Sequence, residues 1–428
     1  MNLIFKEYLE FLQEKGIDTE KCNLKEGYYW LDNQIVKAYD KQGTLHKVLR
    51  VLVNDNLDMT IKTVYKNKPF EIESWIETIE RNKEQLKALE ANSQLLIRNS
   101  IAKYKESAPK ILSSGGKDSS VTAYLVNQVA KDTDIIFNNT TLDCADTYLH
   151  IKEQEHVQII NPKEGFYQWR DRIQFVGNRI SRACCTLFKE GAMIKALGKN
   201  DKYLFFMGMR NQESKNRSSY VDEWKNEKWG SRDWNAVLPI RKWSEEEIWL
   251  YILWKGISIN PKYKKGYARV GCAVACPYYA KSSWALDKYW YSFQYNRWRS
   301  ILKQDFRNNH KALIMNCTEE EYISKAWNGG VFREEPTEEV IKEFADSNGL
   351  DLEVARKYFC HTCEVCGKRV KSKEVLSMNM KFLSRNTNKF YCKSDLKDVI
   401  SDISNTEFTD ENWDEYVKKF KLQGCSLF

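Results

Sequence analysis

The sequence predicts an α/β fold with a doubly wound parallel sheet, and three observations support this prediction. Short apolar runs of strand character occur at residues 111–112, 135–137, 157–160 and 203–207. Segments of helical character separate these runs, which is the alternation typical of a parallel sheet. Glycine or polar residues directly follow three of the runs. Ligands of doubly wound sheets bind at the carboxyl ends of the strands, so these segments are the first candidates for a binding site.

The first run ends in a glycine turn that leads into an apolar helical stretch beginning at Val121. Gly115 and Gly116 allow the backbone to turn tightly and to approach an anion. Backbone amides at the start of the following helix can then hold a phosphate group. The turn lacks the Gly-x-x-x-x-Gly-Lys-Ser/Thr pattern of P-loop proteins, and its alternative interpretation is an ordinary capped Gly-Gly turn. The predicted phosphate-binding residues are Ser113, Ser114, Gly115, Gly116, Lys117, Ser119 and Ser120, with Asp118 as a ligand for Mg²⁺ or as the helix cap.

Polar residues also follow two later strands. They are Asn139 and Thr140 after the second run, and Gly208, Arg210, Glu213 and Arg217 after the fourth run. Arginine side chains can clamp phosphate or sulfate oxygens through two parallel N–H groups. Glu213 can orient one arginine or coordinate a metal. The alternative interpretation of the second group is a solvated, charged loop.

Two pairs of cysteines form a further candidate site. Cys184 and Cys185 are adjacent and cannot easily bridge each other, and Cys272 and Cys276 follow much later. Four thiolates on one α/β domain can hold an iron–sulfur cluster or a zinc ion. Buried, inert cysteines are the alternative. The chain has 12 cysteines, and in a reducing compartment clustered cysteines indicate metal binding or catalysis more often than disulfides.

A third cysteine cluster lies near the end of the sequence. Residues 360–368 contain a Cys-x-x-Cys-Gly-Lys knuckle, and Cys392 and Asp395 follow with a two-residue gap. This spacing predicts a tetrahedral Zn²⁺ site. Its expected ligands are Cys363, Cys366 and Cys392, with Asp395, Cys360 or His361 as the fourth. Such a module can bind nucleic acid or protein or only stabilise the tail, and free thiols are the alternative.

The remaining sequence suggests five parts. A short amphipathic helix is predicted over residues 2–15 and a β-hairpin or three-stranded module over residues 28–65. The parts are a small N-terminal α+β module (1–72), a long connecting helix (73–105), a nucleotide-binding domain (106–300), a helical extension (301–355) and a zinc-binding C-terminal module (356–428).

The composition limits the setting in which the protein works. The 428 residues include 67 basic and 59 acidic side chains, a net charge of +8 that is compatible with an anionic substrate or a nucleic acid. Residues 262–269 interleave basic residues with tyrosines, which can grip a nucleic-acid backbone; a solvated basic loop is the alternative. No signal peptide and no run of about 18 apolar residues is seen, so we expect a cytoplasmic protein with no membrane partner.

Together these motifs resemble the phosphoadenosine phosphosulfate reductase family and its ATP-using relatives in the PP-loop ATP pyrophosphatase superfamily. The resemblance spans about residues 113–279. It rests on residues 114–119, Asn139-Thr140, Cys184-Cys185 with Lys189, Gly208 and Arg210 with Glu213-Ser214 and Arg217, Pro239-Ile240 with Trp243, and Gly271-Cys272 with Cys276-Pro277.

The resemblance implies an adenine nucleotide alpha hydrolase-like fold, with ATP and Mg²⁺ as ligands and the adenosine near Asn139 and Thr140. The catalytic residues that it implies are Lys117, Asp118, Arg210 and Glu213. In relatives that carry them, the two cysteine pairs bind a [4Fe–4S] cluster, so the resemblance implies one at Cys184, Cys185, Cys272 and Cys276. Three residues separate Cys272 from Cys276, where the family usually has two.

The complete Ser-Gly-Gly-Lys-Asp-Ser string decides between the branches of this resemblance. Reductases do not need to split ATP, typically depart from the string, and carry a nucleophilic cysteine in a Glu-Cys-Gly-x-His-like tail that is not found around Cys425. We therefore expect an ATP pyrophosphatase that adenylates a substrate in sulfur transfer or nucleic-acid modification, most similar in function to the Dnd-type DNA phosphorothioation ATPases. The expected partners are a small-molecule nucleotide, DNA or RNA, and a sulfur-donor protein. A sulfonucleotide reductase that uses Cys425 and a non-catalytic, nucleotide-binding regulatory protein are the alternatives.

Overall fold

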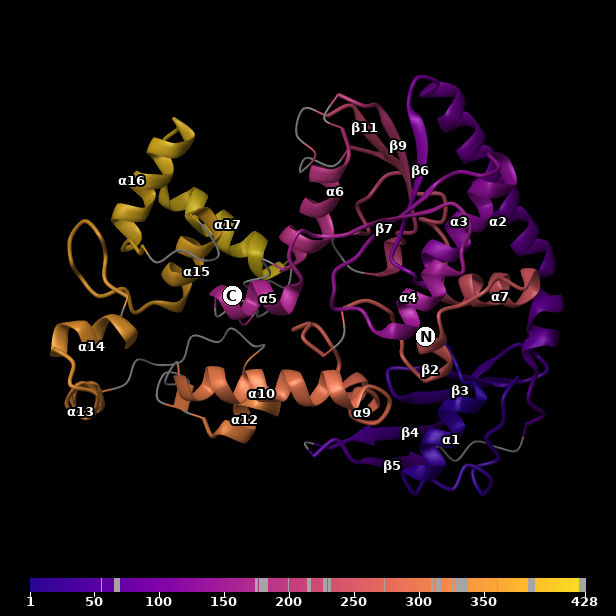
Figure 1. The fold of residues 1–428 in the computed structure, drawn as a ribbon, viewed down its shortest axis with the longest axis horizontal. Helices are drawn as coiled ribbons and strands as arrows, with labels where there is room; N and C mark the ends of the chain where they lie inside the picture. The colour runs from indigo at the N-terminus through magenta and orange to yellow at the C-terminus, as the bar shows by residue number, and fades with distance from the viewer. Residues whose placement is uncertain are drawn as a thin grey trace. The chain divides into compact units, whose positions relative to one another are not determined.

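The computed structural model describes residues 1–54, 56–64, 70–173, 176, 184–198, 200–213, 217–225, 229, 232–272, 274–308, 311–312, 317–324, 327, 337–359, 361–383 and 389–422 (Figure 1). The chain divides into two compact units. The first unit comprises Met1–Arg172, Cys184–Ala275 and Tyr279–Asn296, and the second comprises Ile173–Ala183, Cys276–Tyr278 and Arg297–Phe428. Within the described residues, no helix is both long and apolar enough to cross a membrane.

A six-stranded sheet forms the centre of the first unit (Figure 1). Its strands are β6 (Ala108–Ser113), β7 (Ile135–Asn138), β8 (Val157–Ile160), β9 (Tyr203–Met207), β10 (Glu223–Trp224) and β11 (Trp234–Val237). They lie in the order β10-β11-β9-β6-β7-β8, and every neighbouring pair except β10 and β11 is parallel. The chain therefore proceeds from β6 to β8 on one side and returns to β9 on the other side. This order confirms the predicted doubly wound sheet, with its reversal between β6 and β9.

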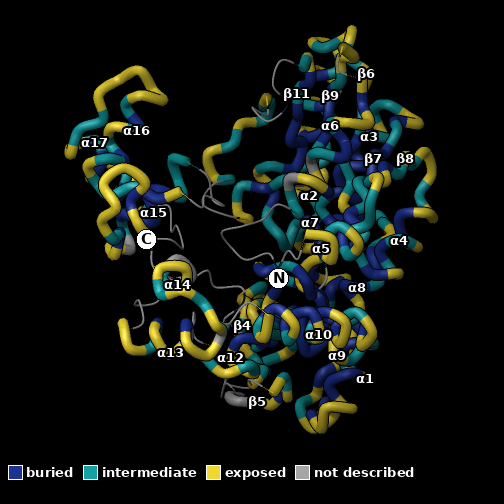
Figure 2. The backbone as a smooth tube through the Cα atoms, turned by 60° about the vertical axis from the view of Figure 1, so that its left-hand side comes forward, coloured by how far each residue is buried: buried dark blue, intermediate teal, exposed yellow. Residues whose placement is uncertain are grey.

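Both faces of this sheet are buried, as a doubly wound fold requires. Leu204 and Phe206 of β9 pack into one hydrophobic cluster with Val121, which lies in the helix that follows β6. Phe205 packs into a second cluster with Met193. Successive side chains of a strand point to opposite faces, so the two clusters lie on the two sides of the sheet. Figure 2 shows the strands of this sheet as a largely buried layer.

Nine helices of the described residues lie wholly in the first unit or extend only one residue beyond it. They are α1 (Lys6–Glu14), α2 (Trp75–Lys103), α3 (Lys117–Val129), α4 (Ala145–Lys152), α5 (Phe166–Ile173), α6 (Gly191–Ala196), α7 (Glu245–Lys255), α8 (Pro261–Lys264) and α9 (Lys281–Trp290). A π-helical turn (Cys185–Glu190) precedes α6, and a 3₁₀ turn (Asn211–Glu213) follows β9.

The long helix α2 forms as the sequence predicts. Ser74 is its N-cap, and Ser74 and Glu77 exchange the two hydrogen bonds of a capping box. Leu86 and Ile97 are fully buried and join the cluster formed with α3 and α7. Ser93 donates to the backbone oxygen of Pro239 at 2.8 Å, which ties the helix to the segment after β11. The helix is therefore part of the core of the first unit.

The N-terminal segment forms a larger sheet than the predicted hairpin or three strands. Five strands pair in the order β1-β2-β3-β4-β5, each antiparallel to the next. They are β1 (Asn2–Leu3), β2 (Tyr29–Asp32), β3 (Ile35–Tyr39), β4 (Leu45–Val53) and β5 (Met59–Val64). The predicted helix over residues 2–15 begins only at Lys6, because Asn2 and Leu3 pair with β2. The buried Asn2 side chain donates to the backbone oxygens of Tyr263 and Tyr267, at 3.0 and 3.1 Å, which holds the edge strand in place.

The second unit is helical in its described part. Its helices are α10 (Ser292–Asn308), which begins in the first unit, α12 (Glu319–Ser324), α13 (Glu338–Asn348), α14 (Leu352–Phe359), α15 (Lys373–Phe382), α16 (Lys393–Ser404) and α17 (Asp410–Leu422). The last three helices share a small core that includes Met378, Leu396 and Trp413. The Trp413 indole donates to Glu374 at 2.9 Å, which satisfies its polar atom inside this core.

Candidate functional site

The glycine turn lies between β6 and α3, where the sequence predicts it. Gly116 is the N-cap of α3, and Gly115 has a φ of +70°, a left-handed conformation that favours glycine. Ser113 accepts a hydrogen bond from the Gly115 amide, and Ser119 accepts one from the Gly116 amide, both at 3.1 Å. These short-range bonds hold the turn at the carboxyl end of β6.

Gly208 directly follows β9, and the absence of a side chain there lets the end of β9 approach the glycine turn. A Cβ atom at Gly208 would lie 2.6 Å from the carbonyl carbon and oxygen of Asp118 and 2.8 Å from the amide nitrogen of Ser119. Backbone atoms cannot move aside as a flexible side chain can, so a residue larger than glycine would push the two strand ends apart. The close approach sets the distance between the glycine turn and the loop that carries Arg210.

A pocket of about 790 Å³ opens between these two strand ends. Its volume lies in the range of small-molecule sites, and it sits where the strand order reverses. Most of the predicted nucleotide-binding and catalytic residues line it. They are Ser113, Ser114, Gly116, Lys117, Asp118, Ser119, Thr140, Gly208, Arg210, Glu213 and Arg217.

Lys117 is the buried cation of the pocket. Its side chain is 5% exposed, and its ammonium nitrogen lies 3.1 Å from a carboxylate oxygen of Asp118 and 3.1 Å from one of Glu245. Burial disfavours the charge on this side chain. Tyr263, Asp118 and Glu245 outweigh that cost and raise the pKa of the ammonium group above its ordinary value. Lys117 is therefore a permanent positive charge at the start of α3.

Two arginines add positive charge from the loop after β9. The buried Arg210 forms an ion pair with Asp118, and its amide donates to Glu213 at 2.9 Å. Glu213 also forms an ion pair with Arg217. Burial opposes ionisation of Asp118, but Lys117 and Arg210 overcome it and lower the pKa of the carboxyl group. The pocket therefore holds a fixed arrangement of cations with carboxylates between them, which suits an anionic, metal-bound ligand.

Three predicted residues do not line this pocket. Gly115 forms the turn itself, and the Asn139 side chain is used in the loop after β7, where it accepts from the Thr141 amide at 2.7 Å and donates to Asn161 at 2.7 Å. The Ser120 hydroxyl donates back to the Gly116 oxygen at 3.2 Å.

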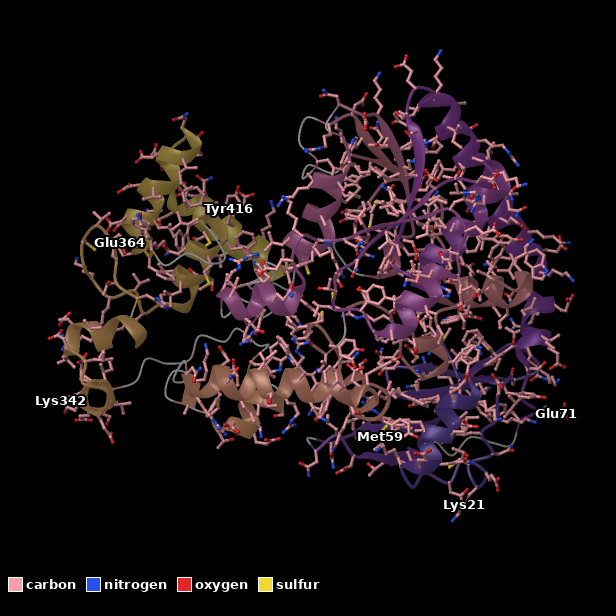
Figure 3. The ribbon with its side chains drawn as sticks, in the orientation of Figure 1. Lys21, Met59, Glu71, Lys342, Glu364 and Tyr416 are labelled. Carbon is pink, nitrogen blue, oxygen red and sulfur yellow. The ribbon has the colours of Figure 1, made fainter. Side chains whose placement is uncertain are left out.

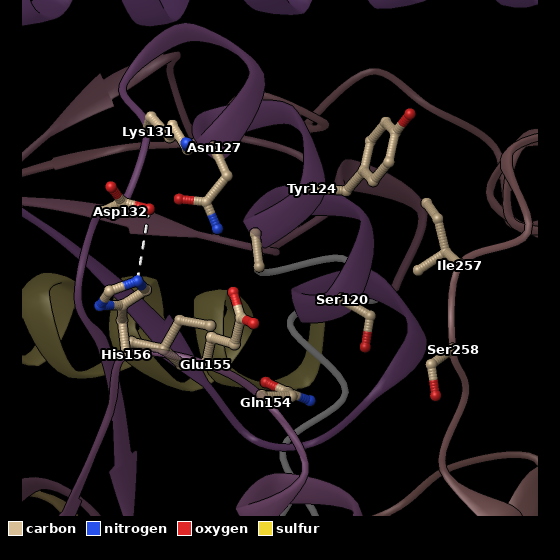
Figure 4. Close-up of a pocket in the computed structure, with 12 residues that line it drawn as sticks. Ser120, Tyr124, Asn127, Lys131, Asp132, Gln154, Glu155, His156, Ile257 and Ser258 are labelled. Atoms are coloured by element: carbon tan, nitrogen blue, oxygen red, sulfur yellow. Dashed lines mark ion pairs between the residues drawn. The ribbon is translucent and has the colours of Figure 1, made fainter.

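Ser120 instead lines a separate pocket of about 410 Å³ beside α3 (Figure 4). The labelled residues of Figure 4 include Asp132 and His156, which form an ion pair at 3.3 Å. Both members of this pair are largely exposed, so the pair contributes little stability. Lys117, Arg210 and Arg217, the cations of the larger pocket, do not line this one.

Asn138, the last residue of β7, lines the pocket instead of its neighbour Asn139. Its amide nitrogen donates to the backbone oxygen of Lys189 at 2.7 Å. Because a carbonyl oxygen can only accept, this bond fixes the amide orientation and turns Oδ1 the other way. That oxygen is buried, and within the described residues it has no hydrogen-bond partner. A buried, unsatisfied acceptor in a pocket wall is a natural site for a ligand N–H group.

The pocket is also lined by residues that the sequence did not single out as site residues, among them Glu245, Tyr263 and Arg269. Glu245 is the first residue of α7, and a capping box between Ser244 and Glu247 closes the start of this helix. The Tyr263 hydroxyl accepts a hydrogen bond from the Lys117 amide at 3.0 Å, and its ring lies 5.6 Å from the lysine ammonium. Tyr263 belongs to the basic, tyrosine-rich segment of residues 262–269, whose pattern alone predicts a solvent-exposed loop or a surface for nucleic acid.

That segment is not a surface for nucleic acid at its tyrosines. Tyr263 and Tyr267 are 2% and 0% exposed, and Lys262 is 0% exposed. Lys262 lies over the Tyr267 ring at 4.4 Å and donates to Tyr279 at 3.1 Å. These three side chains are therefore not available to a nucleic acid, because they pack inward around α8 and brace the glycine turn.

The first cysteine set is spread over both compact units. Cys184 and Cys185 stand at the start of the π-helical turn, and Cys272 follows Gly271; these three cysteines are half-buried and belong to the first unit. Cys276 belongs to the second unit. The iron–sulfur site at these four residues stays a prediction.

The second cysteine set forms a compact group. The ligand atoms of Cys363, Cys366, Cys392 and Asp395 all lie within 4.8 Å of one another. Of the other two candidates for the fourth ligand, Cys360 lies outside the described residues, and the His361 ring packs on Phe390 with their centroids 4.0 Å apart. The structure thus brings together the three expected cysteines and Asp395. Cys425 lies outside the described residues.

Comparisons with known proteins agree with this geometry. Residues 108–277 match the family model of the phosphoadenosine phosphosulfate reductase domain. Two uncharacterized proteins of Methanocaldococcus jannaschii are 27% and 26% identical over 309 and 260 residues, which cover 70% and 59% of this chain. In both cases the match spans 62% of the relative's own length.

More distant matches include proteins with a stated activity. An adenosine 5′-phosphosulfate reductase of Halalkalibacterium halodurans is 27% identical over 171 residues, covering 37% of this chain and 70% of the relative. The crystal structure of phosphoadenylyl-sulfate reductase from Candida auris, in a phosphate complex, aligns with 46% of this chain and 94% of its own, at 16% identity and a TM-score of 0.34.

Proposed function

Residues 108–277 of this chain form a phosphoadenosine phosphosulfate reductase-like domain, and from this premise we propose that the protein is an ATP pyrophosphatase that adenylates a substrate. The observation that carries the proposal is the joint presence, in one pocket, of the complete glycine turn, the buried Lys117 and the loop of Arg210 and Arg217. A reductase that binds an already activated sulfonucleotide has no pyrophosphate leaving group to stabilise.

The pocket supports cleavage between the α and β phosphates of ATP. The start of α3 and Lys117 would hold the phosphates that leave as pyrophosphate, and Arg210 would stabilise the charge that develops on the leaving group. Asp118 and Glu245 provide carboxylate oxygens of the kind that Mg²⁺ binds, both within reach of the Lys117 ammonium. Phosphoryl-type transfers depend mainly on positioning and charge stabilisation, and these residues supply both.

The wall formed by β7 would receive the nucleoside. Thr140 and Asn138 line it, and Asn138 carries a buried Oδ1 that has no partner among the described residues. The exocyclic 6-amino group of adenine is a donor of the kind that this oxygen requires. Asn138, rather than Asn139, is therefore the residue that we expect to select adenine.

We also propose a [4Fe–4S] cluster on Cys184, Cys185, Cys272 and Cys276. The four donors are all thiols, which is the ligand type that such clusters take. When bound, the cluster would supply electrons or sulfur, or would brace the fold. Iron and acid-labile sulfide analysis of an anaerobic preparation, with Cys184→Ser beside the wild type, tests the assignment; equal iron content in both would refute it.

The substrate class is the open part of the proposal. Sulfur transfer to a nucleic acid, with a sulfur-donor protein as partner and the cytoplasm as location, fits an adenylating enzyme of this domain type. The assay that identifies the substrate measures pyrophosphate release from ATP and Mg²⁺ with and without DNA, RNA and a sulfide source. Stimulation by one of these would name the acceptor class.

The central test compares the wild type with Lys117→Met and with a control, Lys105→Met, which removes an exposed lysine after α2. Loss of a preorganised charge donor lowers rates by about 100-fold or more, so pyrophosphate release should fall by that factor in Lys117→Met only. Release of phosphate alone, or no release with any candidate substrate, would refute the proposal. Thiol-dependent release of sulfite from an adenylated sulfate, without pyrophosphate, would identify a reductase instead.

A further inference from the structure

The C-terminal unit contains a cluster of metal-binding side chains that the proposed nucleotide chemistry does not use. We propose that Cys363, Cys366, Cys392 and Asp395 bind one tetrahedral zinc ion, with Asp395 as the fourth ligand. The four ligand atoms lie within 4.8 Å of one another, and no other such group of His, Cys, Asp or Glu occurs among the described residues. Glu364 and Tyr416, labelled in Figure 3, mark this part of the chain.

The local sequence explains why the first two cysteines lie together. Gly367 has a φ of +66°, and its amide donates to the Cys363 oxygen at 2.9 Å. The Cys363 amide in turn donates to the Lys368 oxygen at 2.8 Å. These two bonds close a tight turn, or knuckle, that brings the side chains of Cys363 and Cys366 to one side. The left-handed conformation at Gly367 is the reason for a glycine after the second cysteine.

The other two ligands come from the start of α16. Cys392 is the N-cap of this helix, and Asp395 lies in its first turn. Residues three apart lie on one face of a helix, so Cys392 and Asp395 point the same way. A β-bridge between Cys363 and Phe390 places the knuckle beside this helix start. The local sequence thus positions the two ligands within each pair, and the bridge between Cys363 and Phe390 brings the two pairs together.

The distances fit a single small ion. The sulfurs of Cys366 and Cys392 are 3.8 Å apart, and a tetrahedral zinc ion with Zn–S bonds of about 2.3 Å requires a separation of roughly 3.8 Å between sulfurs. One oxygen of Asp395 lies 2.8 Å from the Cys363 sulfur and 3.1 Å from the Cys392 sulfur. That oxygen faces both sulfurs, as a monodentate carboxylate ligand would. Thiolates select zinc over Mg²⁺ and Ca²⁺, which prefer all-oxygen sites.

Zinc would hold together a part of the chain that has little core of its own. Ten buried residues form the hydrophobic cluster of α15, α16 and α17, and Cys363 is one of them. With three thiolates and one carboxylate, the ligands carry up to four negative charges that repel one another, and the metal offsets this repulsion. Metal binding to such small modules contributes directly to folding. We therefore expect zinc removal to unfold the C-terminal module before the first unit.

The test uses the full chain and measures zinc directly. Wild-type protein should bind one zinc per chain that Cys363→Ser loses, and Co²⁺ in its place should give the intense thiolate charge-transfer absorption of a tetrahedral site. Asp395→Ala should lower zinc affinity at least about tenfold, whereas Asp395→Cys should retain it. Asp398→Ala, an exposed acid on the same helix, is the matched control.

Each variant outcome decides between this assignment and its alternatives. Because Asp395→Cys restores a thiolate, its retained zinc would show that loss in Asp395→Ala is not simply misfolding. Unchanged zinc affinity in Asp395→Ala, combined with loss in a His361→Ala variant, would overturn the choice of Asp395. Unchanged zinc content in Cys363→Ser would overturn the site itself. None of these measurements depends on ATP cleavage, so the result stands apart from the proposed function.

Discussion

Replacing Asn138 by leucine should remove the preference of the pocket for adenine. The substitution keeps the branching at Cγ but eliminates the buried Oδ1, which has no partner among the described residues, and the amide that donates to Lys189. Adenine can donate its 6-amino group to Oδ1, whereas the 6-oxo group of hypoxanthine cannot. The wild type should therefore bind ATP more tightly than ITP, and Asn138→Leu should bind the two alike.

The magnitude follows from the burial of this acceptor. Leaving a buried acceptor unsatisfied costs about 1–3 kcal/mol. With ITP bound the oxygen stays unsatisfied, and with ATP bound it is paired, so the wild type should favour ATP by about 5-fold to 150-fold. The lost hydrogen bond to Lys189 affects both nucleotides equally and cancels in the ratio. It should appear instead as about 1 kcal/mol of lost stability.

Calorimetric titration of ATP and ITP, with Mg²⁺ and without a second substrate, measures the two dissociation constants. For each protein, the dissociation constant of ITP is divided by that of ATP. The informative quantity is this ratio in the wild type divided by the same ratio in Asn138→Leu. A quotient of 5 or more supports the assignment. If the ratio is the same in both proteins, while the variant keeps its folded melting transition, Asn138 does not contact the base and the orientation of the nucleoside is wrong.

Two further predictions concern residues that shape the first unit. Gly208→Ala should weaken nucleotide binding by at least about tenfold, because its Cβ would meet backbone atoms of Asp118 at 2.6 Å. Gly165→Ala, whose nearest neighbours are side-chain atoms at 3.7 Å, is the control; equal binding by both variants in a titration would contradict the packing argument. Burial raises the pKa of Asp287 to about 6, above its value of about 3.9 in the unfolded chain. The contribution of this carboxyl group to the free energy of unfolding is therefore fully present below pH 4 and is lost as the pH rises through 6. Asp287→Asn should therefore gain about 2 kcal/mol more over the wild type at pH 7.5 than at pH 4.5; thermal melts with a pH-independent difference would refute this.

The sequence was most informative where structure depends on local pattern. The strands β6 to β9 follow from short apolar runs, and the glycine turn follows from its own residues, because their geometry is set within a few positions. The same is true of the Cys363–Cys366 knuckle. Pairing between distant segments is harder to predict from the sequence. The strand β1 is only two residues long and forms because it pairs with β2. The choice of Asp395 as the fourth ligand likewise depends on the bridge between Cys363 and Phe390.

The residues that the sequence concealed are those whose role depends on burial. A segment that alternates Lys and Tyr has the same pattern on a nucleic-acid surface and around a buried charge. Here Tyr263 packs against Lys117, and Lys262 lies among tyrosine rings. Asn138 and Asn139 are likewise indistinguishable in sequence, and only strand β7 and its hydrogen bonds decide which of them faces the pocket.

The N-terminal sheet and the pocket around Lys117 are joined through one short helix. Asn2 donates to the backbone oxygens of Tyr263 and Tyr267 on either side of the end of α8, while Tyr263 accepts from the Lys117 amide. Trp30 of the sheet is buried in the same cluster as Val121 of α3. A fragment trimmed to the six-stranded sheet and its helices would thus lose the support behind its own glycine turn and uncover an apolar face. For this protein, the smallest piece that can be expected to retain a competent pocket includes the sheet that precedes it in the chain.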